Sequence, residues 1–402
     1  MKVLIELFDT EQIYNYIATL VFKPEKVYFV GDGEIMGGNC RRKAEKLACM
    51  KNLNTKFLYK FVNPDNFLLL RSKIKEIIED EKKLGNECVI DVTGGRDLAL
   101  VAAGNIMSLG VDVIRYDPKN KIFRTLLNDE THPAEISLSC EEIITVAGGT
   151  VYSNTHSLSF SDKEWEIIDK IIRLYFKKRD VWTKFVKYLQ RISKKEGEKV
   201  GDRLWIEAPA TLNADGKTFS ADTEILSGLE KTGAISDFRF SRKNNRLEFK
   251  YKSSEIANLL VNEGVWLELI IYLTVRNSDV FTDSDTGVKF IWDIPDGKSS
   301  LSQLLSENTP RNEVDVMAVR GIKPIFISCK TRAPINEDLN ELYAIREHFG
   351  GELACAVLAT TKHVELESPI YERARAMGIE IIHEHDLDFG TAKNKLTKLC
   401  EV

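Results

Sequence analysis

The chain has 402 residues, of which 43% are hydrophobic and 29% are charged, and its formal net charge is −5. This length suits two or three domains better than a single core. The slight acidic excess excludes a polycation that binds nucleic acid through its overall charge. Contact with a phosphate backbone would have to come from local basic patches.

The cysteine pattern and the N-terminal segment indicate the compartment. Seven cysteines occur at positions 40, 49, 88, 140, 329, 355 and 400, with no C-x-x-C pair. This argues against a disulfide framework or a zinc cage and favours a reducing compartment. The start, MKVLIELFDT, lacks the pattern of a signal peptide, and no apolar run reaches transmembrane length. We therefore expect a soluble, cytoplasmic protein with no membrane partner.

The first 117 residues alternate short apolar runs with amphipathic segments. This alternation predicts a parallel sheet with helices on its faces, an α/β domain that we assign to residues 1–150. The expected strands are 3–7, 26–30, 56–59, 87–92 and 111–116, and the expected helices are 13–20, 41–50, 67–84 and 98–109.

The middle of the chain, residues 151–253, changes character. A long helical pattern is followed by a second helix and then by two strand patterns joined at Asn244-Asn245. A hairpin that follows helices suggests a winged-helix-like connector. The expected elements are helices 165–193 and 222–232 and strands 204–208, 234–241 and 246–252.

The remaining residues, 254–402, are predicted to form a second, mixed α/β domain. Its patterns alternate between apolar strands and amphipathic helices. The expected helices are 256–276, 336–349 and 369–377, and the expected strands are 288–292, 313–319, 324–329, 353–358 and 379–383.

A glycine-rich turn, Thr93-Gly94-Gly95, lies between a buried strand and a helix. Glycines let a phosphate approach the backbone closely, and the helix start offers free N–H groups. Arg96 could add a charge-assisted contact. A plain strand-to-helix turn capped by Asp97 is an equally good interpretation of the spacing. The turn is neither a P-loop nor G-x-G-x-x-G, which argues against ordinary ATP or NAD chemistry.

Two other strand ends point to the same edge of the expected sheet. Phe8-Asp9-Thr10 follows the first strand, and Gly31-Asp32-Gly33 follows the second. Ligands of open α/β sheets bind at the carboxyl ends of parallel strands. Acidic side chains there suit ribose hydroxyls or adenine amines better than phosphates, although each segment could be a simple loop.

A group of carboxylates and a lysine marks the second domain. Glu313 and Asp315 open one strand pattern, Lys330 closes the next, and Glu268 lies in a helix upstream. A hydrolase of phosphodiesters needs carboxylates for Mg²⁺ or Mn²⁺ and a cation near the scissile phosphate. The alternative is that Asp315 and Lys330 merely pair at a sheet edge.

A second D…E-x-K spacing, Asp237 with Glu248 and Lys250, is interpreted differently. The charged residues of this strand alternate with Leu247, Phe249 and Tyr251. That alternation puts the charges on the solvent-facing side of an amphipathic strand, so we expect no metal site there.

Five segments together resemble a known family: D-V-T-G-G-R-D at 91–97, G-V-W-L-E at 264–268, N-E-V-D at 312–315, S-C-K at 328–330 and R-A-R-A-M-G-I at 373–379. The chain resembles the ancillary nucleases of type III CRISPR systems over most of its length. These proteins join a CRISPR-associated Rossmann-fold (CARF) sensor to a restriction-endonuclease-like domain of the PD-(D/E)xK superfamily.

The resemblance implies a homodimeric sensor of a cyclic oligoadenylate, with cyclic tetra-adenylate as the allosteric activator. The activator would reposition the nuclease domains through the connector. The activator-binding residues would be Phe8, Asp9, Thr10, Gly31, Asp32, Thr93, Gly94, Gly95 and Arg96.

The resemblance also implies an antiviral, metal-dependent nuclease that cleaves DNA or RNA with little sequence specificity. Mn²⁺ or Mg²⁺ would be the cofactor. The catalytic residues would be Glu268, Glu313, Asp315 and Lys330, and the metal ligands would be Glu268, Glu313, Asp315 and the backbone carbonyl of Cys329.

Two departures from the family pattern keep other functions open. Ser328 stands where the family motif has the glutamate of E-x-K, and Arg96-Asp97 stand where the family turn often reads Thr-Lys. The alternative function is a ligand-gated transcription regulator that binds DNA and carries an inactive nuclease-like domain. Degradation of the activator by the sensor would be a side activity at most, because the turn has no evident base.

Overall fold

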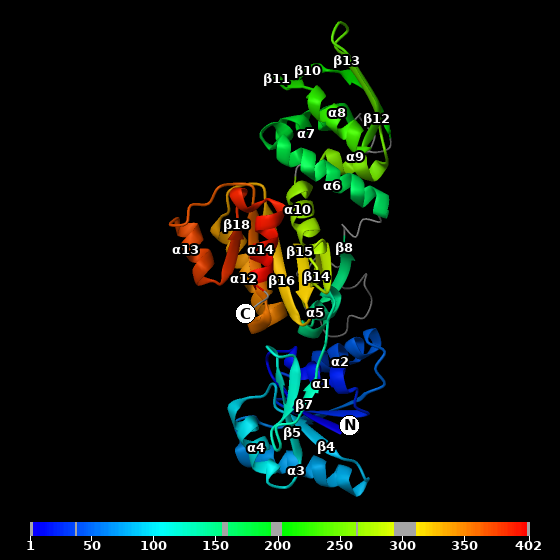
Figure 1. Cartoon of the computed structure of the whole chain (residues 1–402). Coiled ribbons are helices and arrows are strands. Elements are labelled where there is room, and N and C mark those ends of the chain that lie inside the picture. The colour runs from blue at the N-terminus through cyan, green and yellow to red at the C-terminus, as the bar shows by residue number, and fades with distance from the viewer. Residues whose placement is uncertain are drawn as a thin grey trace. The chain divides into compact units, whose positions relative to one another are not determined.

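The computed structural model describes residues 3–36, 38–154, 160–193, 203–262, 264–292 and 311–399. The chain divides into two compact units (Figure 1). The first unit contains Met1–His156, Val275–Cys329 and Ala333–Val402, and the second contains Ser157–Thr274 and Lys330–Arg332. The predicted α/β fold class is confirmed by the sheets and helices of these units.

The first sheet of the first unit has the strand order β3-β2-β1-β4-β5-β6-β7. Strands β3, β2, β1, β4 and β5 pair in parallel, as the sequence predicts, and β6 and β7 add an antiparallel edge. The strands are β1 Val3–Leu7, β2 Lys26–Gly31, β3 Lys56–Phe61, β4 Cys88–Asp91, β5 Asp112–Asp117, β6 Ile122–Thr125 and β7 Thr131–Pro133.

Helices cover both faces of this sheet because each presents one apolar stripe. Helices α1 (Tyr14–Phe22) and α2 (Gly38–Met50) contribute to one buried cluster, and α3 (Phe67–Lys83) and α4 (Asp97–Met107) contribute to the other. The carboxyl ends of β1, β2 and β4 therefore meet at one edge, where their loops are held between the two helical layers.

The second sheet of the first unit has the order β18-β17-β16-β15-β14-β8. Strand β8 comes from far earlier in the chain and pairs antiparallel with β14, and β14, β15 and β16 form an antiparallel meander. The strands are β8 Thr150–Asn154, β14 Asp283–Ile291, β15 Arg311–Arg320, β16 Lys323–Lys330, β17 Cys355–Thr360 and β18 Ile379–Ile382.

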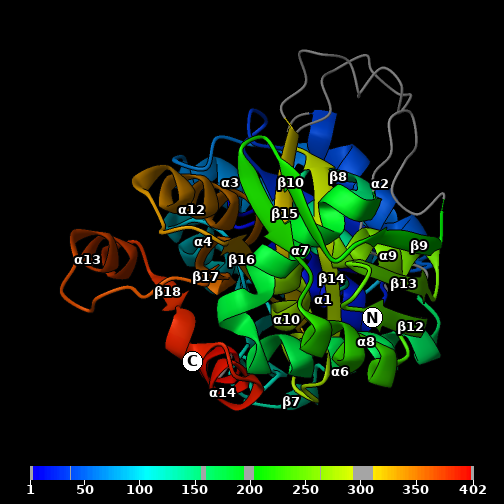
Figure 2. The same cartoon turned by 90° about the horizontal axis from the view of Figure 1, so that it is seen from above.

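The two sheets of the first unit share one apolar core. Helices α5 (Cys140–Ala147) and α12 (Asn336–Gly350) bury their apolar faces in the same cluster as α1 and α2. This cluster joins residues of both sheets, and Figure 2 shows α1, α2 and α12 from above. Helices α13 (Pro369–Ala376) and α14 (Phe389–Leu399) complete this part.

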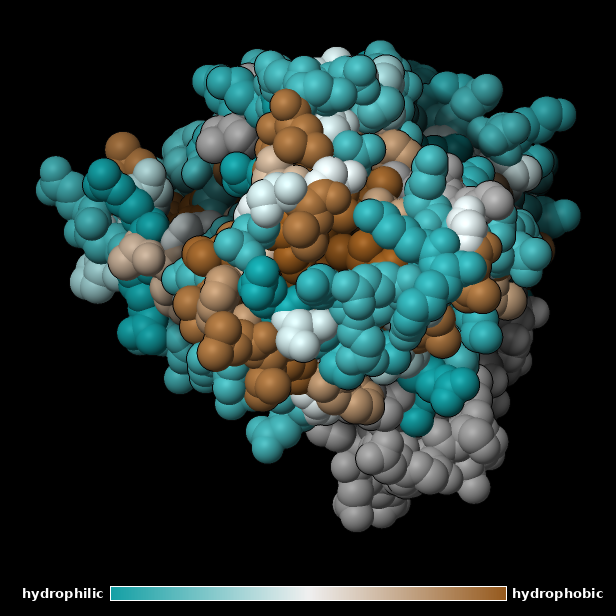
Figure 3. All heavy atoms as spheres, turned by 90° about the horizontal axis from the view of Figure 1, so that it is seen from below, coloured by the Kyte–Doolittle hydropathy of each residue, from teal (hydrophilic) through white to brown (hydrophobic). Residues whose placement is uncertain are grey.

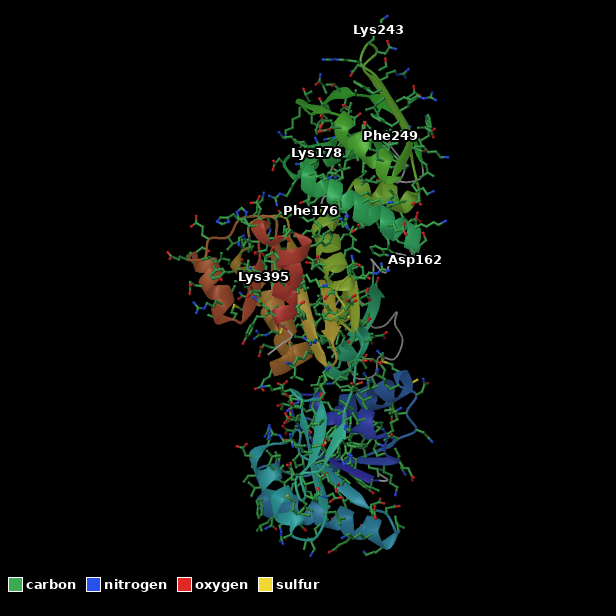
Figure 4. All side chains as sticks on the ribbon, viewed as in Figure 1. Asp162, Phe176, Lys178, Lys243, Phe249 and Lys395 are labelled. Carbon is green, nitrogen blue, oxygen red and sulfur yellow. The ribbon has the colours of Figure 1, made fainter. Side chains whose placement is uncertain are left out.

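The second unit contains helices around two small sheets of orders β12-β13-β9 and β10-β11. Lys243 lies at the tip of the predicted hairpin in Figure 4. Its elements are α6 Asp162–Lys177, α7 Arg179–Ser193, β9 Trp205–Pro209, β10 Thr211–Ala214, β11 Lys217–Ser220, α8 Thr223–Thr232, β12 Ile235–Ser241, β13 Arg246–Tyr251, α9 Ser254–Leu260 and α10 Val265–Arg276.

Two predicted long helices are wrong, because each is broken into two. The helix expected at 165–193 ends at Lys177 and begins again at Arg179. The helix expected at 256–276 breaks between Leu260 and Val265 with a bend of 111°. Asn262 and Gly264 are poor helix formers, and the Asn262 side chain accepts a hydrogen bond from the Gly264 N–H at 3.0 Å.

Strand β14 begins earlier than the apolar pattern at 288–292 predicts. Its first residues are polar, yet they pair with β15 from Asp283 onward. The Asp283 carboxylate accepts a hydrogen bond from the backbone N–H of Cys140 at 2.7 Å. No single helix of the described residues is long and apolar enough to cross a membrane, although α9 and α10 meet that test as a bent pair.

Phe29 should be a stability determinant of the first unit. It is fully buried, and its ring lies 5.6 Å from Phe8 and Tyr59 and 5.8 Å from Tyr16 and Phe57. We expect Phe29→Ala to lower the free energy of unfolding by about 3–5 kcal/mol, because it leaves a cavity among aromatic rings. Urea denaturation followed by far-ultraviolet circular dichroism measures this change.

The matched control is Phe61→Ala in the same sheet, because 61% of the Phe61 surface is exposed. This substitution should change the free energy of unfolding by no more than about 0.5 kcal/mol. Equal losses in both variants would contradict the assignment of Phe29 to the core.

Candidate functional site

A pocket opens at the carboxyl edge of the first sheet. Its lining includes residues from the ends of β1 and β2 and from the start of α4. The structure thus brings together five side chains or backbones that the sequence predicts to bind an activator. These are Phe8, Thr10, Gly31, Asp32 and Arg96.

The glycine-rich turn is packed too tightly for side chains. Gly95 has a φ of +96°, and a Cβ there would lie 2.8 Å from the Cβ of Leu7. A Cβ on Gly94 would lie 2.8 Å from the Cβ of Asp9. Glycine is therefore required by backbone conformation at one position and by close approach at the other. This close packing explains both glycines without a ligand, and Thr93, Gly94 and Gly95 are not among the residues that line the pocket.

Asp9 ties the first loop to this turn. One carboxylate oxygen accepts a hydrogen bond from the backbone N–H of Gly95 at 2.7 Å. The other accepts from the backbone N–H of Glu11 at 2.8 Å. The side chain of Asp9 is thus engaged inside the site, so it organises the loops in addition to any contact with a ligand.

A buried pair of acids lies beneath the turn. Glu6 on β1 and Asp91 on β4 are neighbours in the parallel register, and each is only 1% exposed. Asp91 accepts hydrogen bonds from the Thr93 backbone N–H at 2.8 Å and from the Thr93 hydroxyl at 2.5 Å. The Thr93 hydroxyl oxygen in turn accepts from the N–H of Tyr116 at 2.9 Å. Asp91 therefore holds the turn in place.

Burial shifts the titration of both acids. Desolvation raises the pKa of Asp91 to about 7, against the lowering effect of its bonds to Thr93. Desolvation, followed by repulsion from Asp91, raises the pKa of Glu6 well above its usual range. The pair is therefore protonated over a wider pH range than exposed carboxyls.

A second group of predicted residues lies on the second sheet. Asp315 is half-buried on β15, and its Oδ2 accepts a hydrogen bond from the backbone N–H of Cys329 at 2.6 Å. The Ser328 hydroxyl donates to the same oxygen at 3.3 Å. The Ser328 hydroxyl therefore helps to hold the Asp315 carboxylate in place.

Glu313 lies two residues before Asp315 on the same strand, so both side chains leave the same face of the sheet. The Glu313 carboxylate is 3.4 Å from the ammonium group of Lys289, its cross-strand partner on β14. Lys289 is a contact that the motif spacing does not reveal, since the pairing register is needed to find it.

Glu268 and Lys330 belong to the second unit. Glu268 is half-buried in the first turn of α10, and Lys330 is the last residue of β16. Their convergence with Asp315 stays a prediction. Among the described residues, no three His, Cys, Asp or Glu side chains form a cluster that could hold a metal ion. Mg²⁺ commonly uses only one or two carboxylates with water and substrate phosphate, and the half-buried Asp315 carboxylate is a side chain of that type.

The alternative D…E-x-K spacing in the second unit lies on a solvent-facing strand surface, as predicted. Glu248 pairs with Arg239 at 3.3 Å across the hairpin. Asp237 and Lys250 are exposed, whereas Leu247 and Phe249 are buried.

Comparison with known proteins identifies the C-terminal region. Residues 255–399 match the model of the Card1-like endonuclease domain. This part of the chain is therefore similar to that domain, and the match covers less than half of the chain. No curated protein matches the chain.

Two solved structures share the fold of the whole chain. Protein VC1899 from Vibrio cholerae is similar over 99% of this chain and 97% of its own, with a TM-score of 0.76 and 18% identity. Can2 from Sulfobacillus thermosulfidooxidans, solved in complex with cyclic tetra-adenylate, is similar over 100% of both chains, with a TM-score of 0.64 and 16% identity. These matches show a shared fold over the whole chain, and the match to the endonuclease model supports the nuclease part of the predicted resemblance.

The buried acid pair should make stability depend on pH. The folded protein keeps a proton on Asp91 that the unfolded chain releases above pH about 4. The free energy of unfolding should therefore fall as pH rises from about 4 to about 7, by a few kcal/mol for the Asp91 shift alone. Asp91→Asn should reduce this fall in urea denaturation at about pH 5 and pH 8.

The control is Asp112→Asn, an exposed carboxylate on the neighbouring strand β5. Its pH dependence should match that of the unmodified protein. A pH dependence unchanged by Asp91→Asn would contradict the assignment of a raised pKa to this carboxyl.

Proposed function

We propose that the chain is a metal-dependent nuclease of CRISPR antiviral defence, activated by a cyclic oligoadenylate. The first sheet senses the activator, and the Card1-like endonuclease domain hydrolyses phosphodiester bonds of DNA or RNA. The observation that carries this proposal is the Asp315 carboxylate, which the Cys329 N–H holds on the β15–β16 hairpin of an endonuclease domain.

The activator site would be the pocket at the carboxyl edge of the first sheet. The turn Thr93–Arg96 precedes helix α4, whose free N–H groups and dipole favour a phosphate. Arg96 is exposed and supplies a cation. Can2, which has the same fold, was solved with cyclic tetra-adenylate. These features together favour a cyclic oligoadenylate, with the cyclic tetramer as the first candidate.

A homodimer would present two such pockets to a two-fold symmetric ligand. Helices α3 and α4 pack side by side and leave apolar side chains uncovered. Figure 3 views the end of the molecule that carries these helices, and apolar side chains gather there. We expect a second copy of this chain to cover this apolar surface, because a two-fold symmetric ligand fits a two-fold symmetric dimer. The most exposed of these residues are Leu68 (71%), Leu69 (53%) and Val101 (58%).

Asp315 would hold a Mg²⁺ or Mn²⁺ ion with Glu313 or Glu268 and the backbone carbonyl of Cys329. Such an ion would lower the pKa of bound water and stabilise charge on the phosphate. Lys330 would place a positive charge near the scissile phosphate. The regulator alternative has no comparable support, since the family match lies in an endonuclease domain.

Cleavage should require both the activator and the Asp315 charge. With Mn²⁺ and cyclic tetra-adenylate, we expect cleavage of labelled single-stranded DNA, single-stranded RNA or supercoiled plasmid. Asp315→Asn should lower the rate roughly a hundred-fold or more, because several kcal/mol of charge stabilisation are lost. Asparagine keeps an acceptor for the Cys329 N–H, so this variant isolates the charge.

The matched control is Glu372→Gln, an exposed carboxylate on α13 of the same domain. It should cleave as the unmodified protein does. Activator binding without cleavage of any substrate would contradict the nuclease assignment and favour the regulator.

The apolar face of α3 and α4 should hold two copies together. Sedimentation equilibrium should give twice the chain mass of 45.7 kDa. Val101→Glu should shift the protein toward the monomer, because it buries a charge in an apolar contact. Leu366→Glu, at a residue that is 63% exposed in the endonuclease domain, should leave the mass unchanged. A Val101→Glu dimer as stable as the unmodified one would contradict this interface.

A further inference from the structure

The Asp9 side chain accepts a hydrogen bond from a backbone N–H that an anionic ligand at this turn would also use. Its carboxylate accepts the Gly95 N–H at 2.7 Å, immediately before the start of α4. Backbone N–H groups at such a position bind phosphates. A carboxylate and a phosphate oxygen carry like charges and use the same donor, so the two compete for it.

The backbone of Asp9 is held independently of its side chain. The Asp9 N–H donates to the Asn15 side-chain oxygen at 2.7 Å, and the Asn15 amide donates back to the Asp9 carbonyl at 2.9 Å. Asn15 is 1% exposed in helix α1. Rotation of the Asp9 side chain therefore leaves the backbone at the end of β1 in place. It changes only the contacts that this side chain makes with the residues that follow.

The next link is Glu11, whose N–H donates to the second Asp9 oxygen at 2.8 Å. The Glu11 carboxylate lies directly against Gly351, where a Cβ would overlap it. The backbone of Glu352 lowers the pKa of Glu11. Gly351 and Glu352 belong to the short helical turn η1 (Gly351–Leu353) that follows α12.

This contact brings several carboxylates together in a partly buried environment. Burial is the main cause that raises the pKa of Glu11, and the carboxylates of Glu352, Asp9 and Glu347 raise it further. Glu11 lines a small cavity with residues of α5, α12 and η1. The contact is therefore one that the protein gives up readily once the Asp9 bonds are lost.

Helix α12 connects this contact to the endonuclease site. Its 15 residues span about 22 Å. It buries Leu339, Leu342 and Ile345 in the core that the two sheets share, so it moves as one body. Its amino end follows β16, the strand that carries Ser328 and Cys329 beside Asp315.

We propose that Asp9 and Glu11 form a latch in which the protein's own carboxylate takes the phosphate donor of Gly95 and thereby holds Glu11 against the end of α12. An anionic ligand that takes the Gly95 N–H displaces Asp9, releases Glu11 from Gly351 and Glu352, and frees α12. This inference rests on the proposed function, because it assigns the regulation of that endonuclease.

The test compares Asp9→Ala, Glu11→Ala and the unmodified full-length protein. Hydrogen exchange of the backbone amides of residues 349–353 is measured with and without cyclic tetra-adenylate, beside Mn²⁺-dependent cleavage and activator affinity. In the unmodified protein, the activator should speed exchange there. Both variants should show fast exchange without activator and cleavage raised about tenfold or more, as expected for lost hydrogen bonds to charged groups.

The two variants should differ in affinity. Asp9→Ala should bind cyclic tetra-adenylate more tightly, because the competing carboxylate is gone, whereas Glu11→Ala should bind it with unchanged affinity. Glu11→Gln keeps a side chain of the same size against Gly351 and should not raise cleavage without activator. Glu341→Ala, an exposed carboxylate on the same helix, should behave as the unmodified protein. Thermal unfolding confirms that each variant is folded.

Three results would overturn the latch. The first is slow exchange and low cleavage in Glu11→Ala without activator, and the second is unchanged exchange in the unmodified protein with cyclic tetra-adenylate bound. The third is no binding of cyclic tetra-adenylate, which would also remove the proposed activator. Binding of cyclic tetra-adenylate without cleavage of any substrate would contradict only the nuclease assignment. The hydrogen-exchange measurement would then test the latch by itself.

Discussion

The hydrogen bond between the Asp9 carboxylate and the Gly95 N–H is the constraint on which the carboxyl edge of the first sheet depends. It joins the loop after β1 to the turn after β4, two segments that only the parallel sheet brings together. Gly94 and Gly95 are glycines because Asp9 and Leu7 approach them so closely. Asp91 supports the same turn from below through Thr93. The N–H group that a bound phosphate would use is thus already taken by the protein's own carboxylate.

The shared apolar core explains how such an edge can affect a second sheet. Helix α12 contributes Leu342 and Phe349 to the cluster that also contains Tyr16 and Ile17 of α1. Packed cores deform little, so a displacement at one end of α12 is carried along its length. At its other end the chain returns to β16, whose Cys329 N–H fixes Asp315. Helix α12, strand β15 and β16 as far as Cys329 belong to the same compact unit.

The sequence predicts much of this fold because its strands are short, apolar and regularly spaced. The strands from β1 to β5 and the edge on which Phe8, Gly31 and Arg96 meet follow from that pattern. The breaks in the helices do not follow from the sequence pattern. The buried residues Tyr175 and Trp182 keep a helical spacing across the break between α6 and α7, so the periodicity does not reveal the break. The first residues of β14 are polar, so an apolar pattern does not predict this part of the strand. Its pairing with β15 forms the strand there instead. The contacts of Ser328 and Lys289 depend on strand register. The contact of Glu11 joins segments that are far apart in the chain. Residue spacing in the sequence predicts neither kind of contact.

The most direct test of the account is the structure of the full-length protein with cyclic tetra-adenylate bound. We expect a phosphate oxygen within hydrogen-bond distance of the Gly95 N–H, the Asp9 carboxylate turned away from it, and the Glu11 carboxylate no longer against Gly351. A bound activator with the Asp9–Gly95 hydrogen bond intact would contradict the proposed latch, because the ligand would not have displaced Asp9.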